Sequence, residues 1–134
     1  MARFFRLITV LALSACAGHG VNVSAPVGAY PPRDLAGRRP LTRAEASGFT
    51  ETSSYADVMV FIEALRQGNE DMYVTSLGKS PQGKDLPLVI MSRPLVKTPA
   101  EAKRLGHPIV LIQANIHGGE VEGKEALLAL LRDL

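Results

Sequence analysis

The sequence has little cysteine, little net charge and no long hydrophobic run. A single cysteine in 134 residues excludes an intrachain disulfide. The formal charge of +2, with no Lys/Arg block interleaved with aromatics, argues against a nucleic-acid surface. Internal repeats and the glycine patterns of phosphate-binding loops are also missing. With 46% hydrophobic and 21% charged residues the chain is an ordinary globular protein, so any function must be sought in individual motifs.

The first fifteen residues have the build of a bacterial export signal. Arg3 and Arg6 precede the apolar segment 7–13, which is too short to span a bilayer. The stretch "LSAC" resembles the lipobox of bacterial lipoproteins, in which the cysteine is acylated and becomes the new N-terminus. This resemblance predicts a signal peptide over 1–15, a lipid on Cys16, and a place in the bacterial cell envelope, the periplasm or outer membrane. Cleavage after "ACA" at Ala17 would instead give a secreted protein.

The next segment predicts a flexible tether, and the folded part starts after it. Residues 17–48 are rich in Gly, Pro, Ala and Ser and show no sustained apolar period. We therefore expect a tether over 16–48 and a folded domain over 49–134. The tether would join the domain to the membrane only through the lipid at Cys16, where the acylated sulfur would also be lost as a metal ligand.

A helix and a hairpin are predicted first in the folded part. Ser54 can cap a helix with Asp57 three residues on, and Gly68 ends it. The helix carries an apolar stripe for the core, made of Tyr55, Val58, Ile62 and Leu65. "MYVTSLGKS" and "DLPLVIMS" then predict two strands joined by "PQGK", with Gly83 free to take positive φ. Pro87 in the second strand indicates an edge position or a bulge.

The last third predicts a helical turn at 100–105, a buried strand and a helix. The apolar run 109–114 is typical of a strand covered on both faces. The helix after it shows the stripe Leu127, Leu130, Leu131 and Leu134, and we expect Glu122 and Lys124 on its surface. The other elements are too few to cover such a strand, so we expect apolar faces left in contact with water.

The segment between this strand and helix, "IHGGE", is the candidate site. His117 leaves the end of the strand, Gly118 and Gly119 make a bend, and Glu120 enters the helix. Catalytic zinc is typically held by three protein ligands with nitrogen, oxygen or sulfur donors, and His117 and Glu120 could supply two. Without a metal, the same residues can be a hydrogen-bonded histidine and a glutamate that suits the helix dipole.

Three segments together resemble the zinc carboxypeptidase family, in its bacterial form. "QANIHGGEVEGKEALLALLRDL" is similar to the segment whose H-x-x-E element gives the first two zinc ligands. "SSYADVMVFIEALRQ" resembles the opening helix of that family. "SLGKSPQGKDLPLVIMS" resembles its G-x-S-x-x-G hairpin, here Gly78, Ser80 and Gly83. The three occur in the family's order over residues 49–134.

The resemblance implies the N-terminal part of an α/β catalytic domain, with a mixed sheet flanked by helices, truncated before its end. It implies zinc as cofactor, His117 and Glu120 as metal ligands, and a peptide or related amide cut at a terminal residue. The family's third zinc ligand, carboxylate-binding arginine and catalytic glutamate lie further downstream, so we expect the fragment alone to be inactive. Gly119 stands where digestive members carry an arginine, which bears on substrate preference.

Two other functions fit the same pattern, and two other histidines do not help. An N-acyl amino acid deacylase shares a similar His/Glu pair, and a small envelope lipoprotein would have no chemistry. His107 precedes the strand that His117 follows, about 20 Å away at ~3.3 Å per residue, and His19 lies in the tether. The sequence therefore predicts two zinc ligands.

Overall fold

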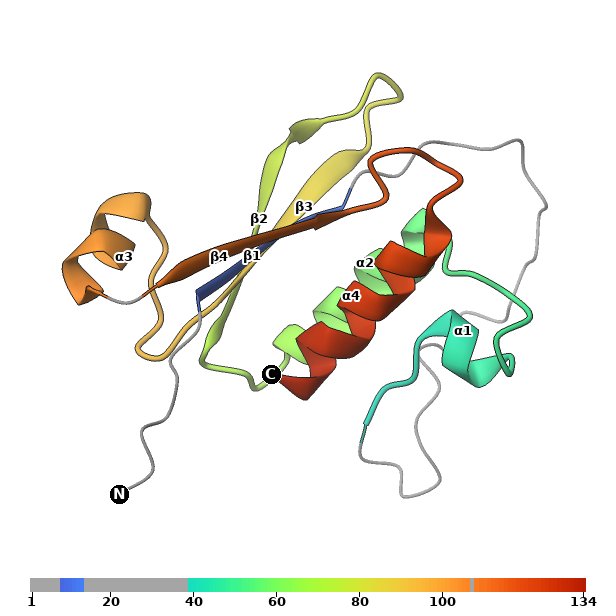
Figure 1. The fold of residues 1–134 in the computed structure, drawn as a ribbon, viewed down its shortest axis with the longest axis horizontal. Coiled ribbons are helices and arrows are strands. Elements are labelled where there is room, and N and C mark those ends of the chain that lie inside the picture. The colour runs from blue at the N-terminus through green and yellow to red at the C-terminus, as the bar shows by residue number, and fades with distance from the viewer. Residues whose placement is uncertain (1–7, 14–38, 107) are drawn as a thin grey trace. The chain divides into compact units, whose positions relative to one another are not determined.

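The computed structural model describes residues 8–13, 39–106 and 108–134 and shows an α/β chain (Figure 1). The described residues form two compact units. The sheet unit comprises residues 8–13 and 69–113, and the helical unit comprises residues 39–68 and 114–134. Along the chain the elements are β1 (Ile8–Leu13), α1 (Arg43–Ala46), α2 (Tyr55–Arg66), β2 (Met72–Lys79), β3 (Asp85–Met91), α3 (Pro99–Leu105), β4 (Ile109–Ala114) and α4 (Val121–Asp133).

The predicted hairpin is confirmed as β2 and β3, an antiparallel pair. Gly83 takes φ +76° in the connecting turn, where its amide donates to the Ser80 carbonyl at 2.8 Å. The register shifts between Ser76 and Lys79, next to the position where Ser76 faces Pro87. The predicted bulge is therefore present beside Pro87, near the start of β3, and β3 lies between β2 and β1 in the strand order β2-β3-β1-β4.

Strand β1 lies within the segment that the sequence predicts to be an export signal. It pairs antiparallel with β3, from Thr9 opposite Met91 to Ala12 opposite Leu88. The sheet thus includes six residues for which the sequence predicts a role in targeting and none in the fold.

The core of the sheet unit forms where β3 meets the connection to β4. Ile90, Val96 and Ala102 are buried together, and Tyr73, Leu88 and Leu105 pack against them. Helix α3 confirms the predicted turn at 100–105. It starts one residue earlier, because Pro99 occupies its first turn and Thr98 forms a capping box with Glu101.

Strand β4 is confirmed as a strand, but the prediction that both its faces are buried is wrong. Its residues alternate, and Ile109 and Leu111 are 49% and 64% exposed. Side chains two residues apart share one face of a strand, so this apolar face is open to solvent. The wet apolar face expected from the short supply of covering elements is therefore present.

In the helical unit, α2 and α4 lie side by side (Figure 1). Ser54 caps α2 in a capping box with Asp57, as predicted. Val58 and Ile62 of the predicted stripe are buried, and so is Phe61, which lies between them. No helix within the described ranges has the length and apolar character needed to cross a membrane.

The buried face of α4 differs from the predicted leucine stripe. Lys124, Leu127, Leu128 and Leu131 are buried, whereas Leu130 and Leu134 are 38% and 53% exposed. At about 100° per residue the four buried side chains share an arc of about 100°, whereas Leu130 and Leu134 lie outside that arc on the side away from Leu128, so the packed face is rotated toward Leu128.

The tether expected over 16–48 does not extend to residue 48 in the structure. Thr42 is buried and caps α1 in a capping box with Glu45. Arg132 of α4 holds this segment, donating to the Pro40 carbonyl at 3.2 Å and to Glu45 Oε2 at 2.6 Å. A four-residue helix is too short to leave a periodic apolar pattern, so the sequence does not predict it.

Candidate functional site

The segment after β4 turns sharply before α4 starts. The Glu120 amide donates to the His117 carbonyl at 3.0 Å, so Gly118 and Gly119 are the central residues of a tight turn. The bend is where the sequence predicted it, but the left-handed residue is Asn115, with φ +57°, and not a glycine. Glu120 occupies the N-cap position of α4. The turn thus places residues 117 and 120 on the same side of the chain.

The imidazole of His117 and the carboxylate of Glu120 meet at this turn. His117 Nδ1 and Glu120 Oε1 lie 2.7 Å apart, and the His117 amide donates to Glu120 Oε2 at 3.4 Å. Their side chains are 79% and 53% exposed. The two groups converge as a shared ion requires, and both are open to solvent. A bound ion would take the place of the hydrogen bond between them.

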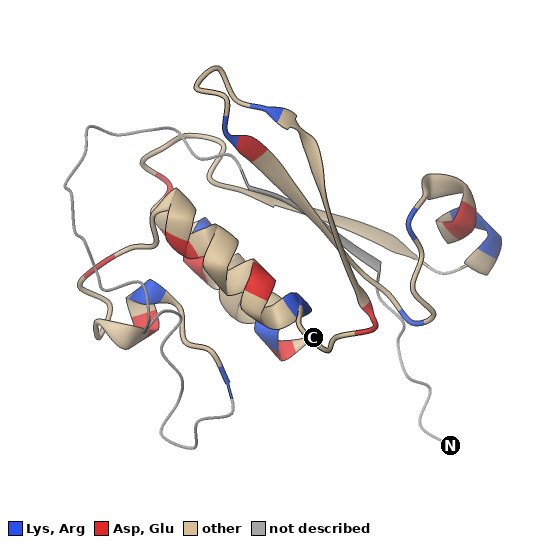
Figure 2. Ribbon diagram, turned by 180° about the vertical axis from the view of Figure 1, so that it is seen from behind, with Lys and Arg blue, Asp and Glu red and all other residues tan. Residues whose placement is uncertain are grey.

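The charge of Glu120 is favoured by its neighbour. The hydrogen bond from the His117 side chain, joined by that from its backbone amide, lowers the pKa of Glu120 below the ordinary 4.5. An acidic residue lies just before α4 (Figure 2), and Glu122 lies in the first turn of the helix, where the helix dipole favours negative charge. The carboxylate is therefore anionic at neutral pH, the state in which it can ligate a cation.

The pair accounts for part of a zinc site. A catalytic zinc typically takes three protein ligands, and one imidazole nitrogen with one carboxylate oxygen are donors of the right kind for two. Within ranges 39–106 and 108–134 no group of three or more His, Cys, Asp or Glu side chains is placed to hold a metal. Cys16, His19 and His107 lie outside the described residues. His117 and Glu120 are donors of the types that zinc takes, and their roles as its ligands stay a prediction.

Lys124 is buried, and its predicted place on the helix surface is wrong. It is only 7% exposed, and its Nζ donates to the Ser53 carbonyl. Its pKa is lowered by burial, an effect that the charge of Glu125 opposes. Glu122, the other residue assigned to the surface, is exposed. The signal for Lys124 is its position one turn before Leu127 and Leu128, on the face that packs.

Glu125 completes a polar connection between α4 and the segment before α2. Its carboxylate accepts from the Ser53 amide at 2.5 Å, from the Ser53 hydroxyl at 3.0 Å and from the Thr52 hydroxyl at 2.8 Å. Lys124 Nζ lies 3.7 Å from the same carboxylate. These contacts fix the first turns of α4, which begin directly after Glu120. Sequence reasoning missed this connection, because partners more than 70 residues apart leave no local pattern.

Gly123 allows the start of α4 to approach the end of β4. A Cβ atom at this position would lie 3.3 Å from the Ala114 Cβ, closer than ordinary van der Waals contact. Two small residues therefore set the spacing between the strand end that precedes His117 and the helix that follows Glu120.

The chain is thus an α/β protein in which a strand, a glycine turn and a helix bring together an imidazole and a carboxylate. These are two of the donor types that bind metals in proteins. The family model described as zinc carboxypeptidase matches residues 58–134, more than half of the chain and inclusive of this turn. The chain belongs to the zinc carboxypeptidase family, as the three resembling segments predict. No curated protein and no solved structure matches the chain.

Proposed function

We propose that the chain belongs to a zinc-dependent metallocarboxypeptidase that hydrolyses a terminal peptide bond, and that His117 and Glu120 are two of its zinc ligands. The observation that carries the proposal is the 2.7 Å approach of His117 Nδ1 to Glu120 Oε1. It occurs at a solvent-exposed turn inside the segment that matches the family. Among the residues that the structure describes, no third side chain joins this pair to hold a metal.

A bound zinc would polarise the scissile carbonyl and supply a water molecule of lowered pKa as the nucleophile. The role of this chain is to bind and orient. His117 would offer an imidazole nitrogen and Glu120 a carboxylate oxygen, and without the ion the hydrogen bond from His117 keeps the pKa of Glu120 lowered. The contacts of Lys124 and Glu125 hold the helix that starts behind the pair. Residue 119 is glycine, so the backbone beside Glu120 presents no side chain to the substrate.

The substrate class and the location are parts of the same proposal. A peptide or a related amide is the substrate that this chemistry serves, and acylation at Cys16 would hold the protein at the cell envelope. "LSAC" supports the anchor, because it places a leucine and two small residues ahead of the cysteine.

The test is a zinc titration of the full chain, followed through the imidazole NMR signals of its histidines and through bound zinc measured by mass spectrometry. We expect zinc to shift the His117 signals, and we expect His117→Ala and Glu120→Ala each to weaken binding at least about tenfold, because each removes one of two donors. Glu70→Gln, an exposed acid in the sheet unit, is the control and should bind as the wild type does.

Wild-type affinity in both alanine variants would contradict the assignment of the ligands. Absence of any zinc-dependent shift in the wild-type chain would contradict the zinc site itself.

A further inference from the structure

The helical unit contains an open cleft that the proposed zinc pair does not use. It has a volume of about 510 Å³, in the range of small-ligand sites, and runs between the α1 region and one face of α4. Residues that line it include Glu45, Phe49, Glu51, Val121, Glu122 and Glu125. His117 and Glu120 are not among the lining residues, so the cleft is a separate feature of the chain.

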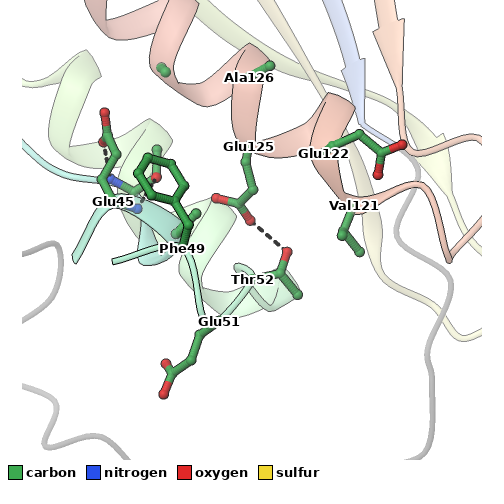
Figure 3. Close-up of a pocket in the computed structure, with 11 residues that line it drawn as sticks. Glu45, Phe49, Glu51, Thr52, Val121, Glu122, Glu125 and Ala126 are labelled. Atoms are coloured by element: carbon green, nitrogen blue, oxygen red, sulfur yellow. Dashed lines mark hydrogen bonds between the residues drawn. The ribbon is translucent and has the colours of Figure 1, made fainter. Parts of the chain in front are cut away.

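Phe49 gives the cleft an exposed aromatic wall. It is 79% exposed and takes φ +65°, a left-handed conformation that L-residues rarely adopt. Its amide donates to the Ala44 carbonyl at 2.7 Å, which holds the backbone in this shape. Figure 3 shows Glu45 and Phe49 toward one end of the lining residues and Val121 and Glu122 toward the other. A large aromatic ring left in water beside an apolar cleft is a surface for a ligand.

The charges of the cleft all have one sign. Every ionisable side chain that lines it is a glutamate. Glu45 forms an ion pair with Arg132, whose Nη1 lies 2.6 Å from Glu45 Oε2. Glu125 accepts hydrogen bonds from Ser53 and Thr52. Glu122 has no side-chain partner within the described residues. A cation held near Glu122 would gain a carboxylate partner, and the ring of Phe49, toward the other end of the lining residues, offers an apolar surface to a neighbouring side chain.

We propose that this cleft binds a peptide segment in which an arginine or lysine is flanked by apolar side chains. The apolar side chains would cover the ring of Phe49 and the alanines of α4, and the cation would face the carboxylate of Glu122. Apolar lining with acidic charge excludes an anionic occupant, and an apolar ligand without charge would leave Glu122 facing it unpaired. The site needs no metal, so it is independent of the proposed zinc function.

The probe is acetyl-Leu-Arg-Leu-amide, titrated into the full chain and followed by amide NMR shifts. Acetyl-Leu-citrulline-Leu-amide is the matched peptide, because citrulline keeps the shape of arginine without its charge. We expect shifts at the lining amides of residues 49–52 and 121–126, and at least about fivefold weaker binding of the citrulline peptide. Binding of the arginine peptide should weaken as salt is raised.

The protein variants separate the two contacts. Glu122→Gln should weaken the arginine peptide about fivefold and leave the citrulline peptide unchanged, whereas Phe49→Ala should weaken both peptides about fivefold. Glu70→Gln should bind both peptides as the wild type does. Equal binding of the two peptides, wild-type affinity in Glu122→Gln, or shifts confined to residues outside the cleft would each overturn the proposal. Because Glu122 is exposed, its variant keeps the fold, and a negative result counts against the site.

Discussion

The two units of the molecule are stabilised in different ways. The sheet unit has an apolar core around Ile90 and Val96 and leaves an apolar face of β4 open at Leu111. The helical unit adds buried polar contacts between α4 and residues far away in the sequence, through Lys124 and Arg132. Apolar contacts have little directionality, whereas hydrogen bonds fix orientation. The candidate metal ligands therefore belong to the unit whose contacts can hold a helix start at a defined angle.

The largest expected effect comes from the apolar part of the helical unit. Leu128 is fully buried, so Leu128→Ala should lower the free energy of unfolding by about 2–5 kcal/mol. Leu130→Ala, two residues on in the same helix and 38% exposed, is the control and should cost much less. Urea unfolding followed by circular dichroism measures both. Equal losses of unfolding free energy in the two variants would support the leucine stripe that the sequence predicts. They would contradict a packed face that includes Leu128 and leaves Leu130 exposed.

A smaller effect is expected from the polar contact that distinguishes the helical unit. Lys124→Met should cost about 1–3 kcal/mol, because it leaves the Ser53 carbonyl and the Glu125 carboxylate without their cation. Lys103→Met, at an exposed position of α3, is the control and should change little.

The effect of Lys124→Met on the free energy of unfolding should depend on pH, whereas that of Lys103→Met should not. Burial lowers the pKa of Lys124 below the ordinary 10.5, so the folded chain releases this proton before the unfolded chain does. Stability should therefore rise with pH in the window between the lowered pKa and 10.5, and Lys124→Met should lose that rise. A variant that keeps the full pH dependence would show that another group causes it.

The smallest expected effect is on the open face of the sheet unit. Leu111 is 64% exposed, so Leu111→Ala should change the free energy of unfolding by no more than about 0.5 kcal/mol. Ile90→Ala, in the core of the same unit, should cost about 2–5 kcal/mol. If thermal or urea unfolding showed similar losses for both, the face at Leu111 would be covered in solution and the contrast between the units would fail.

Local patterns predicted most of the fold. The capping box of Ser54, the glycine of the hairpin turn and the proline of α3 act over a few residues, and each element they predict is present. The errors concern contacts between distant residues. The burial of Lys124 depends on Ser53, and the order of residues 39–48 depends on Arg132, so neither leaves a mark in the neighbouring sequence.

The candidate site was predictable for the same reason. His117 and Glu120 are three residues apart, so a tight turn is enough to join them, and both the spacing and the glycines are visible in the sequence. The cleft at Phe49 could not be predicted, because its two walls come from residues 42–52 and 121–129. A site made by one turn can be found in a sequence, whereas a site made by two distant segments needs coordinates.

If residues 1–15 are the export signal that the sequence predicts, their removal would take strand β1 out of the sheet. Its partner on β3, residues 88–91, hydrogen-bonds to a segment that processing before Cys16 would cut away. The processed chain would then carry bare amide and carbonyl groups along β3, a seam open to invasion by any extended polypeptide. Cleavage would thus create an unpaired strand edge, which in the precursor is paired with β1.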